Sequence, residues 1–384
     1  MTEHGSGFDG ERLGHLTQAI KADVAAERYD GAVVLIARQG EVVLSEAVGF
    51  ADRATNRPAR TDDVFHLFSV TKTFTAMAVL QCVDRGELQL TTPVADVIPE
   101  FGTKGKQRIL VAQLLNHTAG MPPEVPPLGA DRVGDLEAMA LAVCDQPLLT
   151  TPGSRVSYSP IGAYAVLGEV ARRLDGGTRP FREILHEELF APLDMNETSL
   201  GLRADLAPRI SPVVVRDTTP GLFPRIALEA MNELQSETFE MPGGGAVGTA
   251  ADLFRFGEAL RCGGSLDGER VLSAALLSLA IQNHTGCEPN HLFDAWRETR
   301  GWDSFPANIG LGFFVRGEGI FPMPFGLTAS PETFGGLGAG SIMFWVDPRR
   351  ELVFVCLTTG LIEDSRHFER MQRLSDLVLS AVTA

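Results

Sequence analysis

Segments that favour β-strands lie near the two ends of the chain, and this separation limits the folds that the chain can adopt. Near the start, residues 31–37 and 41–47 are rich in branched apolar side chains and are joined by a short glycine-containing turn, which predicts a β-hairpin. Near the end, residues 309–315, 341–346 and 351–358 have a similar strand-forming composition. We therefore predict that both ends of the chain build one antiparallel sheet.

Helical patterns precede, follow and separate these strands. Apolar residues at helical spacing predict amphipathic helices over residues 8–28 and from about 367 to 382. The middle of the chain is mostly helical, with proline and glycine interruptions. We expect an α/β (α+β) fold of two domains: residues 1–86 and 246–384 form a sheet domain flanked by helices, and residues 87–245 form an inserted, mostly helical domain. The active site is expected in the cleft between them.

The composition excludes several functional classes. The formal net charge of −16, without a cluster of lysines or arginines, argues against nucleic acid or an anionic membrane as the partner. No run of 18 apolar residues is present, so no transmembrane helix is predicted, and the polar first residues predict a cytoplasmic protein. The five cysteines lack C-x-x-C spacing, which disfavours a disulfide framework or a zinc site. We expect no metal and no cofactor.

A serine and a lysine three residues apart stand at the start of a helical pattern over residues 68–83. Residues three apart share a helix face, so Ser69 and Lys72 are expected side by side. A buried amine with a lowered pKa can activate a serine, and the free N–H of Ser69 could face a developing oxyanion. The alternative is an ordinary serine N-cap before an apolar run.

Three other features carry possible chemistry. Tyr158 precedes an apolar helix and could move protons from a cleft, but by itself it is interpreted as a packed aromatic residue with a hydrogen-bonded hydroxyl. His117 is interpreted as a capping or core histidine, because the sequence supplies no orienting partner for it. The glycines of residues 243–248 match G-x-G-x-x-G, but no clear strand precedes them, so a dinucleotide site is rejected. They are expected to let the backbone pass close to a cleft.

Several separate stretches together resemble the serine β-lactamase and D,D-peptidase superfamily, which includes penicillin-binding proteins. The resemblance is closest to carboxylesterases and transesterases with a class C β-lactamase-like fold. The matching stretches occur in the family's order over residues 65–360: Phe68-Ser69-Val70-Thr71-Lys72, Arg85-Gly86-Glu87-Leu88 with Pro93-Val94, Leu114 to Gly120, Tyr158-Ser159 with Leu167-Gly168, Pro192 to Met195, Gly243 through Asp252, and Gly335 to Pro348.

The resemblance implies covalent acyl transfer. Ser69 would attack a carbonyl carbon and form an acyl-enzyme, and Lys72 and Tyr158 would share the proton as general base and acid. The oxyanion would be held by the N–H groups of Ser69 and Ala339, and the strand residues Gly336, Leu337 and Gly338 would line the substrate site. In an alternative register, Phe334-Gly335-Gly336 is the third family motif and Leu337 supplies the amide.

Two departures from the family pattern bear on the substrate. Class C β-lactamases carry asparagine two residues after the tyrosine, where this chain has Pro160, which has no N–H to donate. The third motif begins with lysine, histidine or tryptophan, where this chain has Gly336. Efficient β-lactam hydrolysis is therefore not expected.

The pocket is expected to be shaped by three loop segments, residues 121–135, 213–240 and 284–308.

The function that this reasoning favours is a serine hydrolase that acts on small carboxylic esters. The alternatives are an amidase or D-aminopeptidase, a biosynthetic transesterase (acyltransferase), and a homologue that binds a ligand without turnover. The partner in each enzymatic case is a small-molecule ester or amide. The sequence does not specify the acyl group, its acceptor or the oligomeric state.

Overall fold

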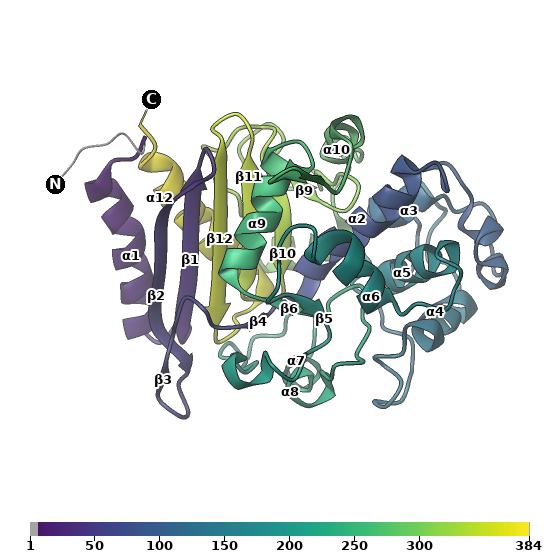
Figure 1. Ribbon diagram of the computed structural model, residues 1–384, viewed down its shortest axis with the longest axis horizontal. Helices are drawn as coiled ribbons and strands as arrows, with labels where there is room; N and C mark the ends of the chain where they lie inside the picture. Colours follow the sequence, from purple (N-terminus) through teal and green to yellow (C-terminus); the bar gives the residue numbers. More distant parts are fainter. Residues whose placement is uncertain (1–6, 384) are drawn as a thin grey trace.

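The computed structural model describes residues 7–383 of the chain and contains a central antiparallel sheet of seven strands (Figure 1). The strand order is β3-β2-β1-β12-β11-β10-β9, so strands from the two ends of the chain lie side by side. The prediction of one sheet built from both ends is therefore confirmed. The strands are β1 (Gly31–Arg38), β2 (Glu41–Asp52), β3 (Arg57–Pro58), β9 (Phe314–Val315), β10 (Phe334–Gly338), β11 (Ile342–Asp347) and β12 (Leu352–Thr359).

The centre of this sheet is buried on both faces. Strand β1 pairs with β12 along its whole length, from Gly31 opposite Thr359 to Arg38 opposite Leu352. Alternate side chains of a strand point to opposite faces. Val33 accordingly joins the hydrophobic core on the side of helix α9 (Ala250–Arg261), whereas Val34 joins the core formed with α1 (Gly10–Ala25) and α12 (Asp364–Ser380). The sheet is thus the middle layer between helices (Figure 1).

The predicted terminal helices are present, and their first turns are capped by side chains. Asp9 accepts hydrogen bonds from the N–H groups of Glu11 and Arg12 at the start of α1. At the start of α12, Glu363 accepts hydrogen bonds from the N–H groups of Ser365 and Arg366. This cap begins the helix a few residues before the expected position, because an N-cap carboxylate satisfies N–H groups that lack intrahelical partners.

Helices also fill the middle of the chain, on the side of the sheet shown at the right of Figure 1. Helix α2 (Thr71–Asp84) is buried on nearly all sides, and its buried residues include the polar side chains of Lys72 and Gln81 as well as apolar ones. The division into domains at residues 86 and 246 stays a prediction. The remaining helices are α2 (Thr71–Asp84), α3 (Val111–Leu115), α4 (Leu136–Asp145), α5 (Gly162–Leu174), α6 (Phe181–Leu185), α7 (Arg225–Glu229), α8 (Met231–Leu234), α10 (Ala274–Ala280) and α11 (Asp294–Arg300).

The strand expected over residues 309–315 is mostly wrong, because only Phe314 and Val315 pair as β9. The preceding residues form a tight turn in which the Gly310 N–H donates to the Phe313 carbonyl oxygen. Gly312 has a φ of +93° in this turn, which a glycine adopts without steric cost. The Leu311 N–H donates to the carbonyl oxygen of Ala280 rather than to a neighbouring strand.

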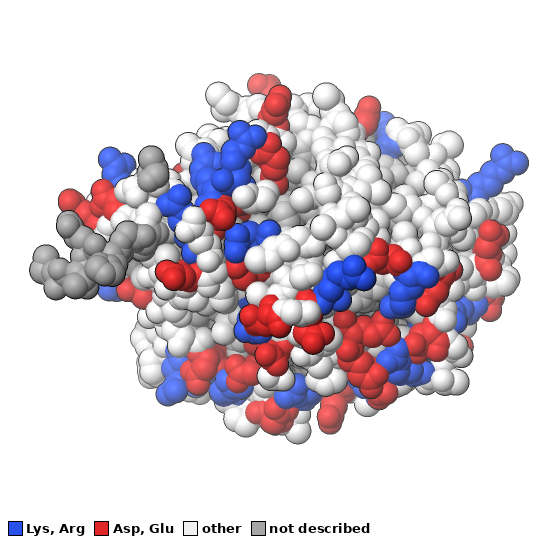
Figure 2. Space-filling model, turned by 45° about the horizontal axis from the view of Figure 1, so that its top comes forward, with Lys and Arg blue, Asp and Glu red and all other residues white. Residues whose placement is uncertain are grey.

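Smaller sheets complete the fold. Strands β4 (Phe65–His66), β6 (Ala246–Gly248) and β5 (Ser199–Leu200) form one antiparallel sheet, and β7 (Ser265–Leu266) and β8 (Glu269–Arg270) form a hairpin. Within residues 7–383, no helix combines the length and the apolar character needed to cross a bilayer. On the face shown in Figure 2, acidic and basic side chains alternate along the lower rim, so this face has no continuous basic surface.

Candidate active site

Ser69 lies in a single 3₁₀ turn, Phe68–Val70, that leads directly into helix α2. The helix was expected to begin at Ser69, but the α-helical residues begin at Thr71. Phe68 has a φ of +45°, an unfavourable conformation for a non-glycine residue, and its carbonyl oxygen accepts a 2.6 Å hydrogen bond from Thr71 Oγ1. This constrained turn leaves Ser69 partly exposed, whereas both of its neighbours are buried.

Lys72 lies beside the serine, as the spacing predicted. Its Nζ atom is 3.0 Å from Ser69 Oγ and donates a 2.6 Å hydrogen bond to the carbonyl oxygen of Gly243. The side chain is only 3% exposed, and no carboxylate among the described residues forms an ion pair with it. Because burial penalises the charged form, the pKa of Lys72 is held well below its usual value.

The glycine-rich segment around residues 243–248 lies against helix α2. The Gly243 carbonyl oxygen meets Lys72, and the adjacent Pro242 carbonyl oxygen accepts a 2.9 Å hydrogen bond from Thr75 Oγ1. A Cβ atom on Gly243 would lie 2.9 Å from the Pro160 carbonyl oxygen, so the close backbone approach expected from the sequence is present. The segment therefore supplies a neutral acceptor to the lysine amine.

Tyr158 joins this pair from a distant part of the chain. It lines one small cavity together with Ser69 and Lys72, and its ring centroid is 5.0 Å from Lys72 Nζ. Burial raises the pKa of Tyr158, while a hydrogen bond with Ser69 acts in the opposite direction. The structure thus brings together a hydroxyl, an amine and a phenol that the sequence predicted to meet.

His117 lies closer to the site than the sequence indicated. Its interpretation as a buried histidine is confirmed, but the absence of an orienting partner is wrong, because its Nδ1 accepts a 3.1 Å hydrogen bond from the Ser159 N–H. Its ring centroid is 4.4 Å from that of Tyr158. Burial holds the pKa of His117 well below its usual value, and a proton on Lys72 would lower it further. A neutral imidazole therefore supports the Tyr158 ring.

Asn290 is a residue of the site that sequence reasoning missed. Its side-chain oxygen accepts 3.1 Å hydrogen bonds from the backbone N–H groups of Tyr158 and Leu292, and the residue is 2% exposed. This contact ties the backbone of Tyr158 to the segment 284–308. No local pattern marks Asn290, because its partner lies more than a hundred positions earlier in the sequence.

The strand β10 passes the other side of Ser69. Leu337, Gly338 and Ala339 line a cavity with Ser69, and Gly336 lies on the Lys72 side of the serine. A Cβ atom on Gly338 would stand 2.5 Å from the Leu67 carbonyl oxygen, which shows how closely the strand approaches the turn at Ser69. The three strand residues predicted for the substrate site, and the predicted oxyanion donor Ala339, therefore all line cavities that include Ser69.

The cavity between Ser69 and the end of β10 is small and mainly apolar, with a volume of about 50 Å³. Segments 213–240 and 284–308 contribute to it as expected, whereas segment 121–135 contributes none of its lining side chains. The apolar side chains that line it are Leu222, Phe223, Phe293, Trp296, Phe314, Leu337 and Phe368.

One carboxyl group borders this apolar cavity. Asp364, the first residue of α12, accepts a 2.8 Å hydrogen bond from the Leu222 N–H. Burial raises the pKa of Asp364 to about 6. At neutral pH the carboxylate therefore disfavours a second negative charge in the cavity.

Among residues 7–383, no group of three or more histidine, cysteine, aspartate and glutamate residues is placed to hold a metal ion.

Comparison with known proteins identifies relatives along nearly the whole chain. Penicillin-binding protein 4 of Amycolatopsis lactamdurans is 32% identical over 272 residues, which cover 67% of this chain and 66% of that protein. Esterase EstB of Burkholderia gladioli is 33% identical over 279 residues, which cover 65% of this chain and 70% of that protein. The crystal structure of a penicillin-binding protein homologue from Caulobacter crescentus matches with a TM-score of 0.78 and 26% identity, covering 97% of this chain and 98% of that chain.

These relatives, together with the fold, define the chain as a serine hydrolase. More particularly, the model of the Beta-lactamase family matches residues 16–377, and the chain belongs to that family. The matched segment spans about two thirds of the length of the two curated relatives.

Proposed function

We propose that this protein hydrolyses small carboxylic esters through an acyl-enzyme formed on Ser69. The observation that carries the proposal is the 3.0 Å separation between Ser69 Oγ and the buried amine of Lys72, whose only other hydrogen-bond partner within residues 7–383 is the neutral Gly243 carbonyl oxygen. A neutral amine has a lone pair that can accept the hydroxyl proton of serine. In the described part of the chain, no carboxylate pairs with this lysine to hold it in its charged form.

In the first step, Lys72 accepts the proton of Ser69 as Oγ forms a bond with the carbonyl carbon of the ester. The carbonyl oxygen becomes an oxyanion, for which the N–H groups of Ser69 and Ala339 are the proposed donors. Ala339 and Leu337 both line the cavity that includes Ser69, so the choice of Ala339 as the second donor is part of the proposal.

In the second step, the leaving alkoxide takes a proton and departs, and water then attacks the acyl-enzyme. Tyr158 is the proposed proton donor to the leaving group, because its raised pKa keeps the phenol protonated in the free enzyme. Lys72, which gained the serine proton, can restore the proton to Tyr158 across the site that they share. In deacylation the same proton transfers run in reverse, with water in place of the alcohol. Water loses a proton to the site as it attacks the acyl carbon, and Ser69 Oγ regains a proton as the carboxylic acid is released.

The cavity supports a short, uncharged acyl group. Its volume is about 50 Å³, its lining is mainly apolar, and the Asp364 carboxyl borders it. An ester is favoured over a peptide or a β-lactam because Pro160 has no N–H for a substrate amide and Gly336 has no charge for a substrate carboxylate. The matched relative EstB is named an esterase, which agrees with this preference.

Mass spectrometry of the intact protein tests the proposal directly. We expect brief incubation with p-nitrophenyl butyrate to add one butyryl mass, located by peptide mapping on the segment that contains Ser69. Turnover of p-nitrophenyl esters should fall as the acyl chain lengthens from acetyl and butyryl to octanoyl, because the volume of the cavity is small. A protein that binds ligands without turnover would gain no acyl mass and release no p-nitrophenol.

The Tyr158→Phe variant is expected to lose about 10² to 10⁴-fold in kcat for ester hydrolysis, because it lacks the proposed proton donor. The ring that packs against His117 and Phe314 is retained, so the fold should persist. Steady-state kinetics and the melting temperature check the two expectations. The Tyr164→Phe variant is a matched control, since Tyr164 Oη bonds the Leu115 carbonyl oxygen; equal losses in both variants would contradict the role of Tyr158.

The Gly336→Lys variant should not become a β-lactamase, although it restores the residue type that the family motif carries. A Cβ atom there would lie 2.9 Å from the buried Phe344 ring and 3.1 Å from Thr73 Cγ2. We expect destabilisation by about 1–3 kcal/mol from overpacking. Urea unfolding measures this loss, with Gly14→Lys on α1 as the control, since a Cβ atom at Gly14 meets nothing within 4 Å. Efficient penicillin hydrolysis by Gly336→Lys would contradict the expectation.

A further inference from the structure

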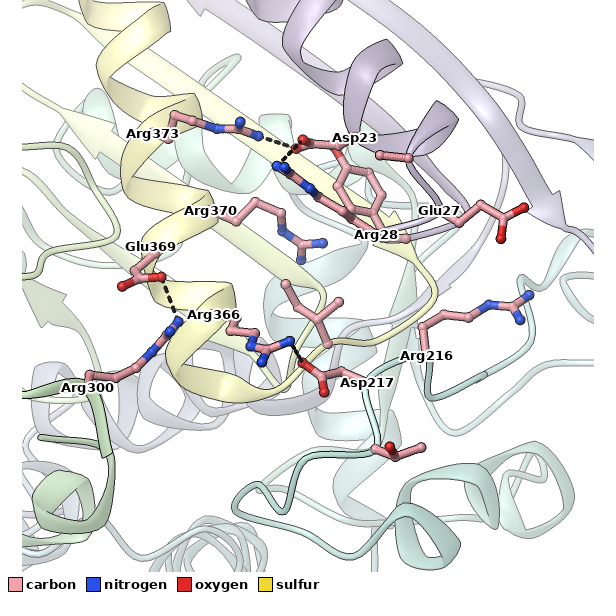
Figure 3. Close-up of a pocket in the computed structure, with 14 residues that line it drawn as sticks. Asp23, Glu27, Arg28, Arg216, Asp217, Arg300, Arg366, Glu369, Arg370 and Arg373 are labelled. Carbon is pink, nitrogen blue, oxygen red and sulfur yellow. Dashed lines mark hydrogen bonds and ion pairs between the residues drawn. The ribbon is translucent and has the colours of Figure 1, made fainter. Parts of the chain in front are cut away.

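A second pocket, of about 740 Å³, lies away from Ser69 at the end of helix α1 (Figure 3). Its wall combines four segments: the end of α1 with the residues after it, the loop at residues 216–218, Arg300 at the end of α11, and one face of α12 with Ile362 just before it. On α12, Arg366, Arg370 and Arg373 follow one another at spacings of four and three residues, which places them on a single helix face. The two ends of the chain and two segments between them therefore supply the side chains that line the pocket.

The lining of this pocket is rich in arginine. Six arginines border it, against the four carboxylates of Asp23, Glu27, Asp217 and Glu369. The whole chain has the opposite balance, with a formal net charge of −16. The excess of guanidinium groups is thus a local property of the pocket and does not follow from composition.

Carboxylates hold several of these guanidinium groups in place. Asp23, which is 3% exposed, accepts hydrogen bonds from both Arg28 and Arg373. Nearer the start of α12, Arg366 pairs with Asp217 at 3.0 Å, and Glu369 pairs with Arg300 at 2.6 Å (Figure 3). One carboxylate shared by two arginines leaves a positive charge uncompensated and fixes both side chains before any ligand binds.

Arg370 adds a buried charge that no described carboxylate balances. It is 7% exposed, and its Nη2 contacts the Gly340 carbonyl oxygen at 3.1 Å and His367 Nδ1 at 2.9 Å. Its Nε and Nη1 have no hydrogen-bond partner among residues 7–383, and its guanidinium lies 4.6 Å from the Tyr29 ring centroid. The hydroxyl of Tyr29, which is also buried and borders the pocket, likewise lacks a partner among those residues.

A guanidinium keeps its charge under all ordinary conditions, so a buried one without a counterion favours an anion nearby. Arginine binds phosphate through paired N–H groups, and guanidinium groups that approach from several walls suit a tetrahedral group with oxygens in all directions. We propose that this pocket binds a small molecule that carries phosphate groups. Its oxygens would be held by the exposed N–H groups of Arg28, Arg366 and Arg373, with Arg370 supplying the unbalanced charge at the floor.

The phosphate site proposed here does not depend on the ester chemistry proposed for Ser69. One side chain of the pocket, Arg370, nevertheless contacts residues next to the Ser69 cavity. Arg370 bonds the carbonyl oxygen of Gly340, the residue that follows Ala339, and contacts His367, which lines the cavity beside Ser69. The binding test therefore uses a direct measurement of the ligand and does not depend on ester turnover.

Isothermal titration calorimetry with inorganic pyrophosphate tests the proposal in about 0.15 M salt, where long-range attraction between exposed charges is screened. We expect saturable binding at a single site, and citrate should bind more weakly than pyrophosphate at equal ionic strength. The Arg366→Gln/Arg373→Gln variant should lose about tenfold or more in affinity, since two phosphate contacts are removed. In contrast, Glu369→Gln should bind pyrophosphate more tightly, because it removes a negative charge from the pocket.

The Arg12→Gln variant is the matched control: Arg12 is an exposed arginine of α1 that pairs with Asp9 outside the pocket, and its loss should leave the affinity unchanged. The melting temperature of each variant establishes that it is folded. Absence of saturable heat in the wild type would overturn the proposal. So would an equal loss of affinity in Arg12→Gln, weaker binding by Glu369→Gln, or citrate binding as tightly as pyrophosphate.

Discussion

Replacing Ser69 by alanine is expected to reduce the turnover of p-nitrophenyl butyrate by about 10³-fold or more, to near the uncatalysed rate. The variant lacks the only oxygen that the proposed mechanism acylates, so it should also gain no butyryl mass. The loss should be in kcat, because the apolar cavity that binds the acyl group is left intact. Steady-state kinetics and intact-protein mass spectrometry provide the two measurements.

The control for this substitution is Ser154→Ala. Ser154 is exposed, and its hydroxyl donates to the Thr151 carbonyl oxygen, away from the site. We expect its kinetics and its acylation to equal those of the wild type. Substantial ester turnover by Ser69→Ala would show that another group carries the reaction, and the assignment of the nucleophile would be wrong.

The Lys72→Met variant is expected to lose about 10² to 10⁴-fold in kcat, because it removes the base that accepts the serine proton. Methionine fills a similar space without a polar atom, so the loss would reflect the amine and not a cavity. In the wild type, kcat/KM should fall as the pH decreases through the lowered pKa of Lys72, since protonation removes the lone pair. A series of rate measurements from acidic to alkaline pH would reveal this acid limb.

The same variant should be at least as stable as the wild type at pH 7. In the unfolded chain Lys72 has a pKa of about 10.4 and is protonated below that pH, whereas burial lowers its pKa in the folded protein. Between those two values unfolding takes up a proton, so the free energy of unfolding of the wild type rises with pH. Lys72→Met removes this dependence, and its advantage should shrink as the pH approaches the unfolded value.

Thermal unfolding of both proteins across neutral and alkaline pH measures this difference. Lys21→Met, at an exposed position of α1, is the control and should change neither activity nor the pH dependence of stability. A Lys72→Met protein that keeps near wild-type kcat would contradict the role of Lys72 as the base. A variant that is markedly less stable at pH 7 would contradict the argument that burial of the amine is costly.

Local patterns in the sequence were sufficient for much of the architecture. The hairpin of residues 31–47 follows from two branched apolar runs and a short turn, and the terminal helices follow from apolar spacing. The strand expected over residues 309–315 was mostly wrong, because Gly310 and Gly312 turn the chain before β9. An apolar run predicts burial but does not by itself predict which backbone groups will pair.

The sequence by itself determined that Ser69 and Lys72 lie together, because residues three apart share one side of a helical turn, whether the turn is 3₁₀ or α. Only the tertiary structure decided what these residues can do. The pKa of Lys72 depends on burial and on the Gly243 carbonyl oxygen, and Tyr158 is held by Asn290 from a remote segment. The arginine-rich pocket likewise forms where α1 meets α12. Desolvation and long-range contacts arise from packing between distant segments, and no local spacing records them.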